Sequence, residues 1–355
     1  MPNNLLIGGS PSKFYHLKEF CNSLNLLKVN CSVVLDSEVY DGFPSRKIRN
    51  WFQSRRKFNN LIDEFEPDII FIDRQRHFGL AALKTNIPLF IHLRGNYWEE
   101  MKWAKKTLYK SFPKSIAIKK WEKIGNACFN GAKVILPICK YLEKIVNEHY
   151  PEKPTEVLYQ GIDPKDWYPQ KGMSLKHPCV GLLQDAKIWE KTKEMLTLAK
   201  VMEAMPNVMF YWAGDGPYRN QVLPALEKYD NFKWLGSLQY PDQVRQFLTE
   251  IDVYALISGI DMSPLTLQEA QLMQKPVVAT NVGGIPELIE DSKTGFLVEK
   301  QNSDEIIEKI NTLVNNDDQR KQMGILGRSF TEKNFKWEII AKRFSDIMNS
   351  YLDKK

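Results

Sequence analysis

The hydrophobic residues of the chain gather in short runs that alternate with segments of helical periodicity. In the first half these runs are NLLI (4–7), CSVVLD (31–36), PDIIFID (67–73), IPLFIHL (87–93) and AKVILPI (132–138). Turn residues bound each run, GGSPS being the turn after the first, and residues 13–27 have the spacing of an amphipathic helix. Near-continuous apolar strands separated by helices are typical of a parallel sheet that is covered on both faces.

A Gly-, Pro- and Asp-rich segment, Gly161–Gly172, has the composition of a linker, and the same alternation resumes beyond it. Strands are predicted within 178–183, 207–214, 231–237, 252–258, 276–282 and 294–298. Helices are predicted at 194–205, after Pro217 and at roughly 336–352. The pattern predicts an α/β fold of two Rossmann-like, doubly wound domains. Because such sheets bind ligands at the carboxyl ends of their strands, we expect two facing domains with a cleft between them.

Composition narrows the class of protein. Of the 355 residues, 43% are hydrophobic and 26% are charged, which excludes a disordered or fibrous chain. No apolar run approaches the ~18 residues of a spanning helix, and the first residues lack the features of a signal peptide. The five cysteines are scattered without a CxxC pair, so we expect free thiols of a reducing compartment and a cytoplasmic protein.

Charge is uneven along the chain. Residues 1–165 hold 26 basic and 17 acidic residues, a net +9, and the remainder holds 23 and 26, a net −3. The positive charge is concentrated in two segments rich in Trp and Phe, SRKIRNWFQSRRKF (45–58) and MKWAKKTLYKSFPKSIAIKKWEK (101–123). Such segments suit either the surface of an anionic membrane or a solvated helix face with its aromatic residues in the core. No nucleic-acid motif accompanies them, so nucleic acid is not the expected partner.

The most informative segment is residues 261–298, DMSPLTLQEAQLMQKPVVATNVGGIPELIEDSKTGFLV. It predicts a helix that Ser263 caps and that begins at Pro264. The backbone N–H groups of Ser263, Leu265 and Thr266 would then point outwards from the positive end of the helix. This arrangement suits a diphosphate.

Two carboxylates accompany this predicted helix. Asp261 precedes it, and Glu269 lies inside it, about two helical turns further along. Carboxylates bind sugar hydroxyls through paired hydrogen bonds. The segment therefore predicts a site for a sugar attached to a diphosphate. The alternative for Asp261 is a residue that caps a turn.

The whole segment resembles the signature of the family-4 retaining glycosyltransferases of GT-B architecture. That signature has two acidic residues separated by seven, then a Gly-Gly-x-Pro-Glu turn, here 283–287, and a T-G-F-L-V run, here 294–298. WAGDGPYR (212–219), QGIDPKDWYP (160–169) and PLFIHLRG (88–95) resemble further family segments. The resemblance implies an acceptor-binding domain at 1–165, a nucleotide-sugar-binding domain at 172–335 and a C-terminal helix, 336–355, that crosses back to the first domain.

The resemblance implies roles for the two carboxylates. Glu269 falls on the residue that binds the ribose of the nucleotide, and Asp261 on the residue that lies near the transferred sugar. The family usually has Glu at the latter position. An Asp carboxylate ends about 1.5 Å short of a Glu carboxylate, and a displacement of this size can matter for rate.

The family also places an Arg and a Lys against the diphosphate. Lys191 fits the lysine position, but Leu182 stands at the arginine position, so Lys187 is the candidate to supply the second charge. Either lysine could also be merely solvated. Cations of this kind stabilise a leaving diphosphate without a metal, so neither a metal nor a cofactor is expected.

The remaining site residues follow from the weaker matches. His92 falls on a family histidine that contacts the donor sugar, although a lone histidine after a strand is commonly structural. Gly8 and Gly9 match a glycine loop at which the backbone approaches donor and acceptor, or form a simple turn. Gly214, in the G-x-G-P-x-R run, is counted with the substrate-binding residues.

Together these features predict a glycosyltransferase that moves a sugar from a nucleotide diphosphate-sugar to an acceptor with retention of configuration. The acceptor is a glycan, or a lipid-linked glycan if the basic segments meet the inner face of a membrane. The alternatives are a sugar-nucleotide-binding protein without catalytic activity and a GT-B nucleotide-sugar epimerase. The residues alone name neither the base, the sugar nor the acceptor.

Overall fold

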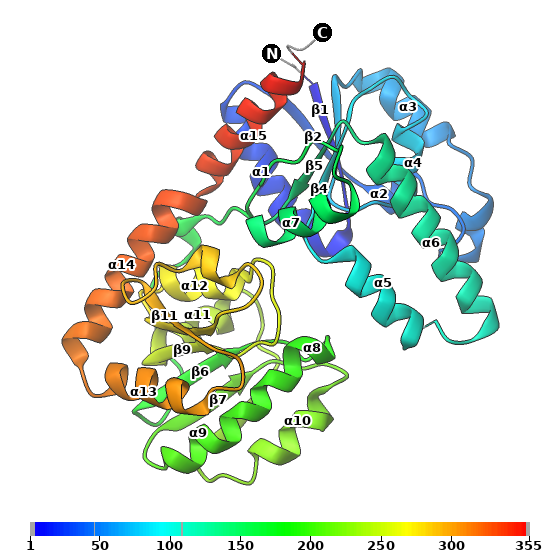
Figure 1. Cartoon of the computed structure of the whole chain (residues 1–355). Helices are drawn as coiled ribbons and strands as arrows, with labels where there is room; N and C mark the ends of the chain where they lie inside the picture. The colour runs from blue at the N-terminus through cyan, green and yellow to red at the C-terminus, as the bar shows by residue number, and fades with distance from the viewer. Residues whose placement is uncertain (1–3, 46, 108, 353–355) are drawn as a thin grey trace. The chain divides into compact units, whose positions relative to one another are not determined.

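The computed structural model describes residues 4–45, 47–107 and 109–352. The chain divides into two units, each with its own sheet (Figure 1). Unit 1 comprises Met1–Gly161 and Trp337–Lys355, and unit 2 comprises Ile162–Lys336. All paired strands of both sheets are parallel, so in each sheet the carboxyl ends of the strands lie along one edge.

Unit 1 holds a five-stranded sheet in the order β2-β1-β3-β4-β5. Its strands are β1 (Asn4–Gly9), β2 (Asn30–Leu35), β3 (Ile69–Ile72), β4 (Leu89–Leu93) and β5 (Val134–Pro137). Its helices are α1 (Phe14–Leu26), α2 (Asp36–Val39), α3 (Arg56–Phe65), α4 (His77–Ala82), α5 (Tyr97–Lys106), α6 (Phe112–Gly131), α7 (Lys140–His149) and α15 (Trp337–Leu352). The strand order reverses between β1 and β3, which is where a doubly wound sheet binds its ligand.

Helices α1 and α15 cover one face of this sheet, side by side (Figure 1). They pack through a cluster of rings in which Phe20 of α1 lies 5.7 Å from Trp337 and 5.2 Å from Phe344 of α15. On the other face, Phe78 and Gly79 of α4 pack against β1 and β3. The last helix of the chain is therefore an integral part of the core of unit 1.

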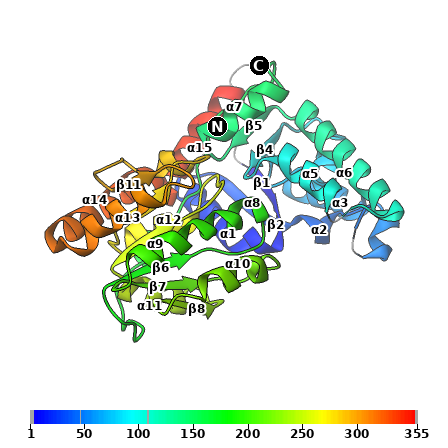
Figure 2. The ribbon, with the colours of Figure 1, turned by 60° about the horizontal axis from the view of Figure 1, so that its bottom comes forward.

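Unit 2 holds a six-stranded sheet in the order β11-β10-β9-β6-β7-β8. Figure 2 labels β11, β6, β7 and β8 of this sheet. Its strands are β6 (Cys179–Leu183), β7 (Met209–Ala213), β8 (Phe232–Gly236), β9 (Val253–Leu256), β10 (Val277–Thr280) and β11 (Gly295–Val298). Its helices are α8 (Trp189–Thr192), α9 (Leu198–Ala204), α10 (Arg219–Leu226), α11 (Asp242–Glu250), α12 (Leu265–Leu272), α13 (Ser303–Val314) and α14 (Asp317–Phe335). The order reverses between β6 and β9, as in a dinucleotide-binding sheet.

Buried residues of α9, α10 and α13 cover one face of this second sheet. Phe247 of α11 packs on the other face against Gly181 of β6. Helix α12 contacts β9, β10 and α14. The predicted fold class, two Rossmann-like doubly wound α/β domains, is confirmed by these two layered parallel sheets.

The structure corrects two details of the predicted elements. The first strand continues through Gly8 and Gly9, because its parallel pairing with β2 extends to Gly9 opposite Leu35. The predicted turn therefore starts only at Ser10. The helix expected at 194–205 begins as a 3₁₀ helix, Lys193–Thr197, and becomes α-helical at Leu198.

The segment that follows Gly161 is anchored to unit 2. Trp167 is buried, and its backbone oxygen accepts a hydrogen bond from Arg328 at 3.0 Å. The side chain of Gln170 donates to the backbone oxygen of Asp242 at 2.7 Å. These contacts give residues 163–170 a defined position on unit 2.

Candidate functional site

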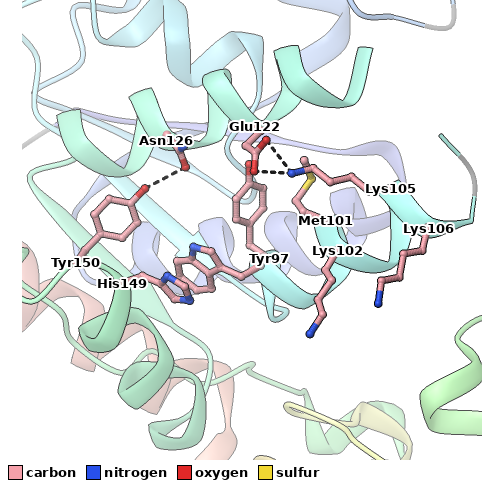
Figure 3. Close-up of a pocket in the computed structure, with 10 residues that line it drawn as sticks. Tyr97, Met101, Lys102, Lys105, Lys106, Glu122, Asn126, His149 and Tyr150 are labelled. Carbon is pink, nitrogen blue, oxygen red and sulfur yellow. Dashed lines mark hydrogen bonds and ion pairs between the residues drawn. The ribbon is translucent and has the colours of Figure 1, made fainter. Parts of the chain in front are cut away.

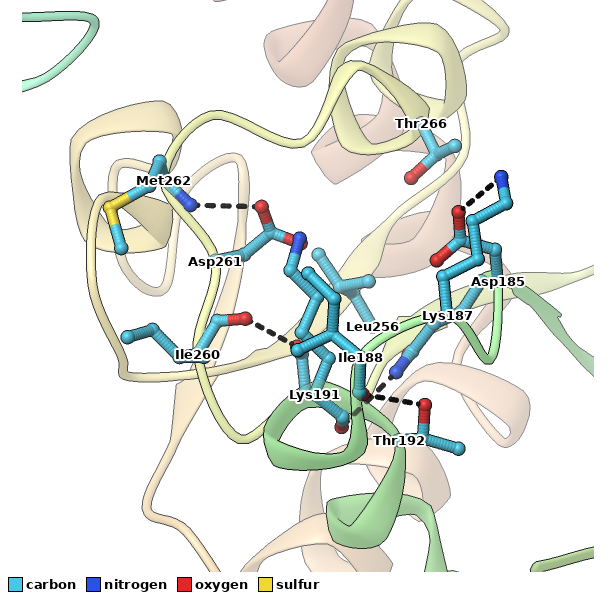
Figure 4. Close-up of polar contacts among 12 residues, drawn as sticks. Asp185, Lys187, Ile188, Lys191, Thr192, Leu256, Ile260, Asp261, Met262 and Thr266 are labelled. Carbon is cyan, nitrogen blue, oxygen red and sulfur yellow. Dashed lines mark hydrogen bonds and ion pairs between the residues drawn. The ribbon is translucent and has the colours of Figure 1, made fainter. Parts of the chain in front are cut away.

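Lys191 and Asp261 meet at the point where the strand order of unit 2 reverses. Lys191 lies on α8, beyond the loop that follows β6, and Asp261 lies in the loop that follows β9. Lys191 Nζ donates to Asp261 Oδ2 at 2.7 Å (Figure 4). Doubly wound sheets bind ligands at this reversal, so the pair occupies the expected ligand position of unit 2.

The environment of the Lys191–Asp261 pair orients the carboxylate. The side chains are only 25% and 15% exposed, so water screens their attraction less than it screens a surface pair. The second oxygen, Oδ1, accepts the backbone N–H of Met262 at 2.8 Å. With a donor on each oxygen, the Asp261 carboxylate is held close to its own backbone.

The backbones that carry the pair are tied to each other. The N–H of Gly259 donates to the backbone oxygen of Lys191 at 3.2 Å, and Ser258 Oγ donates to the oxygen of Ile260 at 2.9 Å. A side chain at Gly259 would lie 2.0 Å from the oxygen of Glu190. The loops after β6 and β9 therefore pack directly against each other next to the ion pair.

The Gly-Gly turn of the predicted signature supports Asp261. Gly283 has φ +58°, and a Cβ added there would lie 2.0 Å from the backbone oxygen of Asp261. That same oxygen accepts the N–H of Gly284 at 2.8 Å. A glycine is needed at 283 because the conformation is left-handed and the approach is too close for a side chain.

The start of α12 differs from the prediction in its cap. The helix begins at Leu265 and Pro264 occupies the cap position, whereas Ser263 makes no capping hydrogen bond and its buried Oγ has no partner. The extended conformation of Pro264 places Ser263 one residue too far from the helix to cap it. The backbone N–H groups of Ser263, Leu265 and Thr266 have no acceptor among the described residues, and all three residues are partly exposed.

Glu269 lies inside α12 and is only 3% exposed. Burial raises the pKa of its carboxyl to about 8, against a smaller opposing effect of the hydrogen bond from Tyr240. A buried carboxyl of this kind is largely protonated at neutral pH. It lies on the helix that begins beside Asp261 but forms no ion pair within the described part of the chain.

The other predicted cation stays apart from the pair. Lys187 is 70% exposed, and its Nζ lies 2.9 Å from Asp185 Oδ2 in the same loop (Figure 4). Leu182, which stands where the family has an arginine, is fully buried in β6. Lys191 is therefore the lysine that the structure brings to Asp261.

Gly214 directly follows β7, in a position without room for a side chain. An added Cβ would lie 1.9 Å from the backbone oxygen of Gln184, at the start of the loop that leads to Lys191. Further along the same run, Arg219 pairs with Asp215 at 3.1 Å and stacks over the ring of Trp234. Gly214 thus lets the loops after β6 and β7 approach each other.

His92, Gly8 and Gly9 belong to unit 1 and are buried. His92 Nε2 donates to the backbone oxygen of Leu158 at 3.0 Å, and burial holds the pKa of the ring well below its usual value. Side chains at Gly8 and Gly9 would strike Phe78 and Leu17. Within unit 1 all three residues have structural contacts that account for them.

A polar network at the carboxyl edge of the unit 1 sheet was missed by the sequence analysis. Asp73, which follows β3 and is fully buried, accepts a hydrogen bond from Arg94, which follows β4. Arg94 also donates to the buried side chain of Gln160. Asp73 and Arg94 each come directly after an apolar run, and this position was the signal available in the sequence.

One group of described residues has the composition of a metal site. His177, Cys179 and Asp252 lie together at the amino end of β6, at the sheet edge opposite Lys191 and Asp261. His177 bridges Asp252 Oδ2 at 2.8 Å and Glu250 Oε1 at 3.0 Å, and both carboxylates raise the pKa of the ring. Both ring nitrogens of His177 thus pair with carboxylates, and the interactions of this group are those of an ion-pair cluster.

Only some of the apolar side chains in the two basic segments of unit 1 lie in its core. Phe52 and Phe112 are 87% and 79% exposed and Ile48 is 67% exposed, whereas Phe58 is buried. Arg46 and Leu108 of these segments lie outside the described residues. None of the described helices combines the length and apolar character that crossing a membrane requires.

Comparisons with known proteins match both units. The protein-family model described as "Glycosyltransferase Family 4" matches residues 21–166. The family model described as "Glycosyl transferases group 1" matches residues 181–316. Together the two models cover most of the chain.

Three individual proteins illustrate these similarities. Spore coat protein SA of Bacillus subtilis is 24% identical over 63% of this chain and 66% of its own length. A GDP-mannose-dependent monoacylated alpha-(1-6)-phosphatidylinositol monomannoside mannosyltransferase of Corynebacterium glutamicum is 30% identical over 43% of this chain and 42% of its own length. The matches thus span less than two thirds of these curated relatives. Anabaena HepE, solved in complex with UDP, shares the fold with a TM-score of 0.69 and 16% identity over 98% of this chain and all of that one.

Proposed function

The chain belongs to the group 1 glycosyltransferases, and on that premise we propose that it transfers a sugar from a nucleoside diphosphate-sugar to an acceptor. The observation that carries the proposal is the Lys191–Asp261 pair beside the free N–H groups of α12, at the strand reversal of unit 2. This place offers a cation, a carboxylate and a positive helix end to one ligand.

Each group has a role in the proposed transfer. The free N–H groups at the start of α12 and the Lys191 ammonium bind the diphosphate and stabilise its charge as it leaves. Asp261 stabilises the positive charge that develops on the sugar, and Glu269 accepts hydrogen bonds from the ribose. Lys191 and the helix end together supply positive charge, so we propose a reaction that needs no metal and retains the configuration of the sugar.

The Asp261 carboxylate changes partner in this proposal. In the free chain Lys191 neutralises it at 2.7 Å, and a diphosphate would compete for the same ammonium. The short Asp side chain is held back by the N–H of Met262, so it remains near the backbone after Lys191 turns to the phosphate. A longer Glu would extend about 1.5 Å further towards the sugar.

Nucleotide release from UDP-, GDP- and ADP-sugars, with and without a membrane lipid extract, tests the function. We expect one donor to be consumed, with release lost in Asp261→Ala and unaffected by EDTA. UDP-sugars come first, because HepE, which shares the fold, was solved with UDP. Equal release by the wild-type chain and Asp261→Ala would refute the catalytic role, and binding of a sugar nucleotide without turnover under every condition would favour a binding protein.

For the acceptor we propose a glycan presented at an anionic membrane surface. The exposed side chains of Ile48, Phe52, Phe112 and Ile116 lie on segments that also carry exposed lysines and arginines. His77 packs 4.9 Å from Trp121 of α6 and donates to the backbone oxygen of Phe43. The ring of Phe43 lies 4.9 Å from that of Trp51, so these contacts link the first segment to the second. Exposed apolar groups amid positive charge are typical of binding to anionic bilayers.

Co-sedimentation with vesicles tests the membrane contact. The chain should bind vesicles that contain phosphatidylglycerol more strongly than neutral ones at low salt, and Phe52→Ser with Phe112→Ser should weaken that binding. Ile325→Ser, at an exposed apolar position of unit 2, is the matched control. Equal binding to neutral and anionic vesicles would contradict the proposal.

A further inference from the structure

Unit 1 contains a hollow of about 500 Å³ that the proposed donor site does not use (Figure 3). Helices α5 and α6 form its walls, and the end of α7 with the following Tyr150 closes one side. All of its lining residues lie between positions 97 and 150. The volume is in the range of sites that hold small molecules.

Two residues that line the hollow, Trp98 and His149, belong to a stack of flat rings. Trp98 lies parallel to His149, with ring centres 4.0 Å apart and planes at 5°, and parallel to Phe129 at 5.7 Å and 20°. Phe129 is buried, whereas Trp98 and His149 line the hollow and His149 is exposed, so the stack runs from the core to the hollow. Flat aromatic faces are surfaces on which the C–H face of a sugar ring can pack.

Hydrogen-bonding groups surround this stack. Tyr150 Oη donates to Asn126 Oδ1 at 3.1 Å, which leaves the Asn126 amide hydrogens for a ligand (Figure 3). Amide and hydroxyl groups beside an aromatic face are the usual means of fixing a polyhydroxylated ring.

The lining is also positively charged. Lys102, Lys105 and Lys106 are opposed within the hollow by the single carboxylate of Glu122, which Lys105 contacts at 2.8 and 2.9 Å. Lys102 also pairs at 3.2 Å with Glu99 of α5, which does not line the hollow. Lys106 has no acidic partner among the described residues, so it is the cation available to a ligand.

We propose that this hollow binds a sugar that carries a phosphate or a carboxylate, as part of the acceptor. The proposal rests on the proposed transferase function. The ring stack takes the face of the sugar, Asn126 takes its hydroxyls, and Lys106, with Lys102 beside it, takes its negative charge. A bare anion would leave the ring stack unused, and a neutral sugar would leave the positive charge unbalanced.

Calorimetric titration with glucose 6-phosphate, glucose and inorganic phosphate tests the binding. Glucose 6-phosphate should bind more tightly than either of the others, and more weakly as salt is added. Lys106→Gln should weaken its binding about three- to fivefold, since a partly exposed ion pair contributes up to about 1 kcal/mol. His149→Ala should weaken the binding of both sugars, and Lys144→Gln, on an exposed part of α7, should change neither.

Two results would overturn the inference. One is equal affinity of Lys106→Gln and the wild-type chain for glucose 6-phosphate, and the other is inorganic phosphate that binds as tightly as glucose 6-phosphate. Acceptor kinetics separate this inference from the transferase proposal. Lys106→Gln should raise KM for an acidic acceptor while nucleotide release without acceptor stays unchanged. Loss of release in Asp261→Ala with unchanged acceptor KM in Lys106→Gln would refute the hollow alone.

Discussion

Replacing Glu269 by Gln should stabilise unit 2 increasingly as the pH rises from 5 to 7. The carboxyl has an ordinary pKa of 4.5 and is raised by burial to about 8 in the folded chain. Between these values the unfolded chain releases a proton that the folded chain keeps, so stability falls as the pH rises. Gln is isosteric, cannot ionise and can still accept the Tyr240 hydroxyl, so it removes this pH dependence.

The size of the effect follows from the shift in pKa. At 1.36 kcal/mol per unit, the raised pKa costs the wild-type chain about 3 kcal/mol of stability at pH 7 and about 1 kcal/mol at pH 5. The advantage of Glu269→Gln over the wild type should therefore grow by about 2 kcal/mol across this range. For a domain of this size, that corresponds to about 4–8 °C in Tm.

Scanning calorimetry of both proteins between pH 5 and pH 8 measures this growth. The change of the Tm difference with pH matters more than its size at any one pH. A Gln that fits imperfectly would shift Tm by the same amount at every pH. Glu203→Gln, at an exposed position of α9, is the matched control and should show no slope. A constant difference in Tm between Glu269→Gln and the wild type would refute the raised pKa.

Three further predictions concern the same unit. Gly283→Ala should weaken nucleoside diphosphate binding by displacing Asp261, whereas Gly236→Ala, which also has a positive φ but open space around its Cβ, should lower Tm without affecting that binding. His177→Asn should lower Tm at pH 6 and much less at pH 9, in calorimetric scans, because a raised pKa stabilises the fold below about 6.5 and this contribution disappears as the pH rises through the folded pKa. Lys191→Met should raise the donor KM in nucleotide-release assays far more than Lys187→Met, whose amine is exposed and paired with Asp185; equal effects would contradict the assignment of Lys191.

The strands and their layering could be predicted because each strand of these parallel sheets is buried on both faces. Burial of that kind leaves a continuous apolar run, as in IIFI of β3 and VYAL of β9, which is visible without any knowledge of neighbours. The cap of α12 was missed because Ser263 and Pro264 differ by one residue in position, and only the extended conformation of Pro264 decides which of them precedes the helix.

The sequence predicts the main residues of the donor site but does not predict the hollow. The loops after β6 and β9 must meet because those strands are neighbours, so residues of these two loops could be expected at one site. The family resemblance then assigned Lys191 and Asp261 to that site. No comparable rule predicts the hollow from the sequence, because the stack of Phe129, Trp98 and His149 joins three helices through side-chain packing alone. In the sequence its lysines merge with the basic run that continues into α6. Only the structure separates the cations that line the hollow beside the ring stack, such as Lys106, from exposed cations elsewhere on α6, such as Lys114. Charge alone therefore indicated an anionic partner, and the arrangement of the rings favours a sugar that carries the charge.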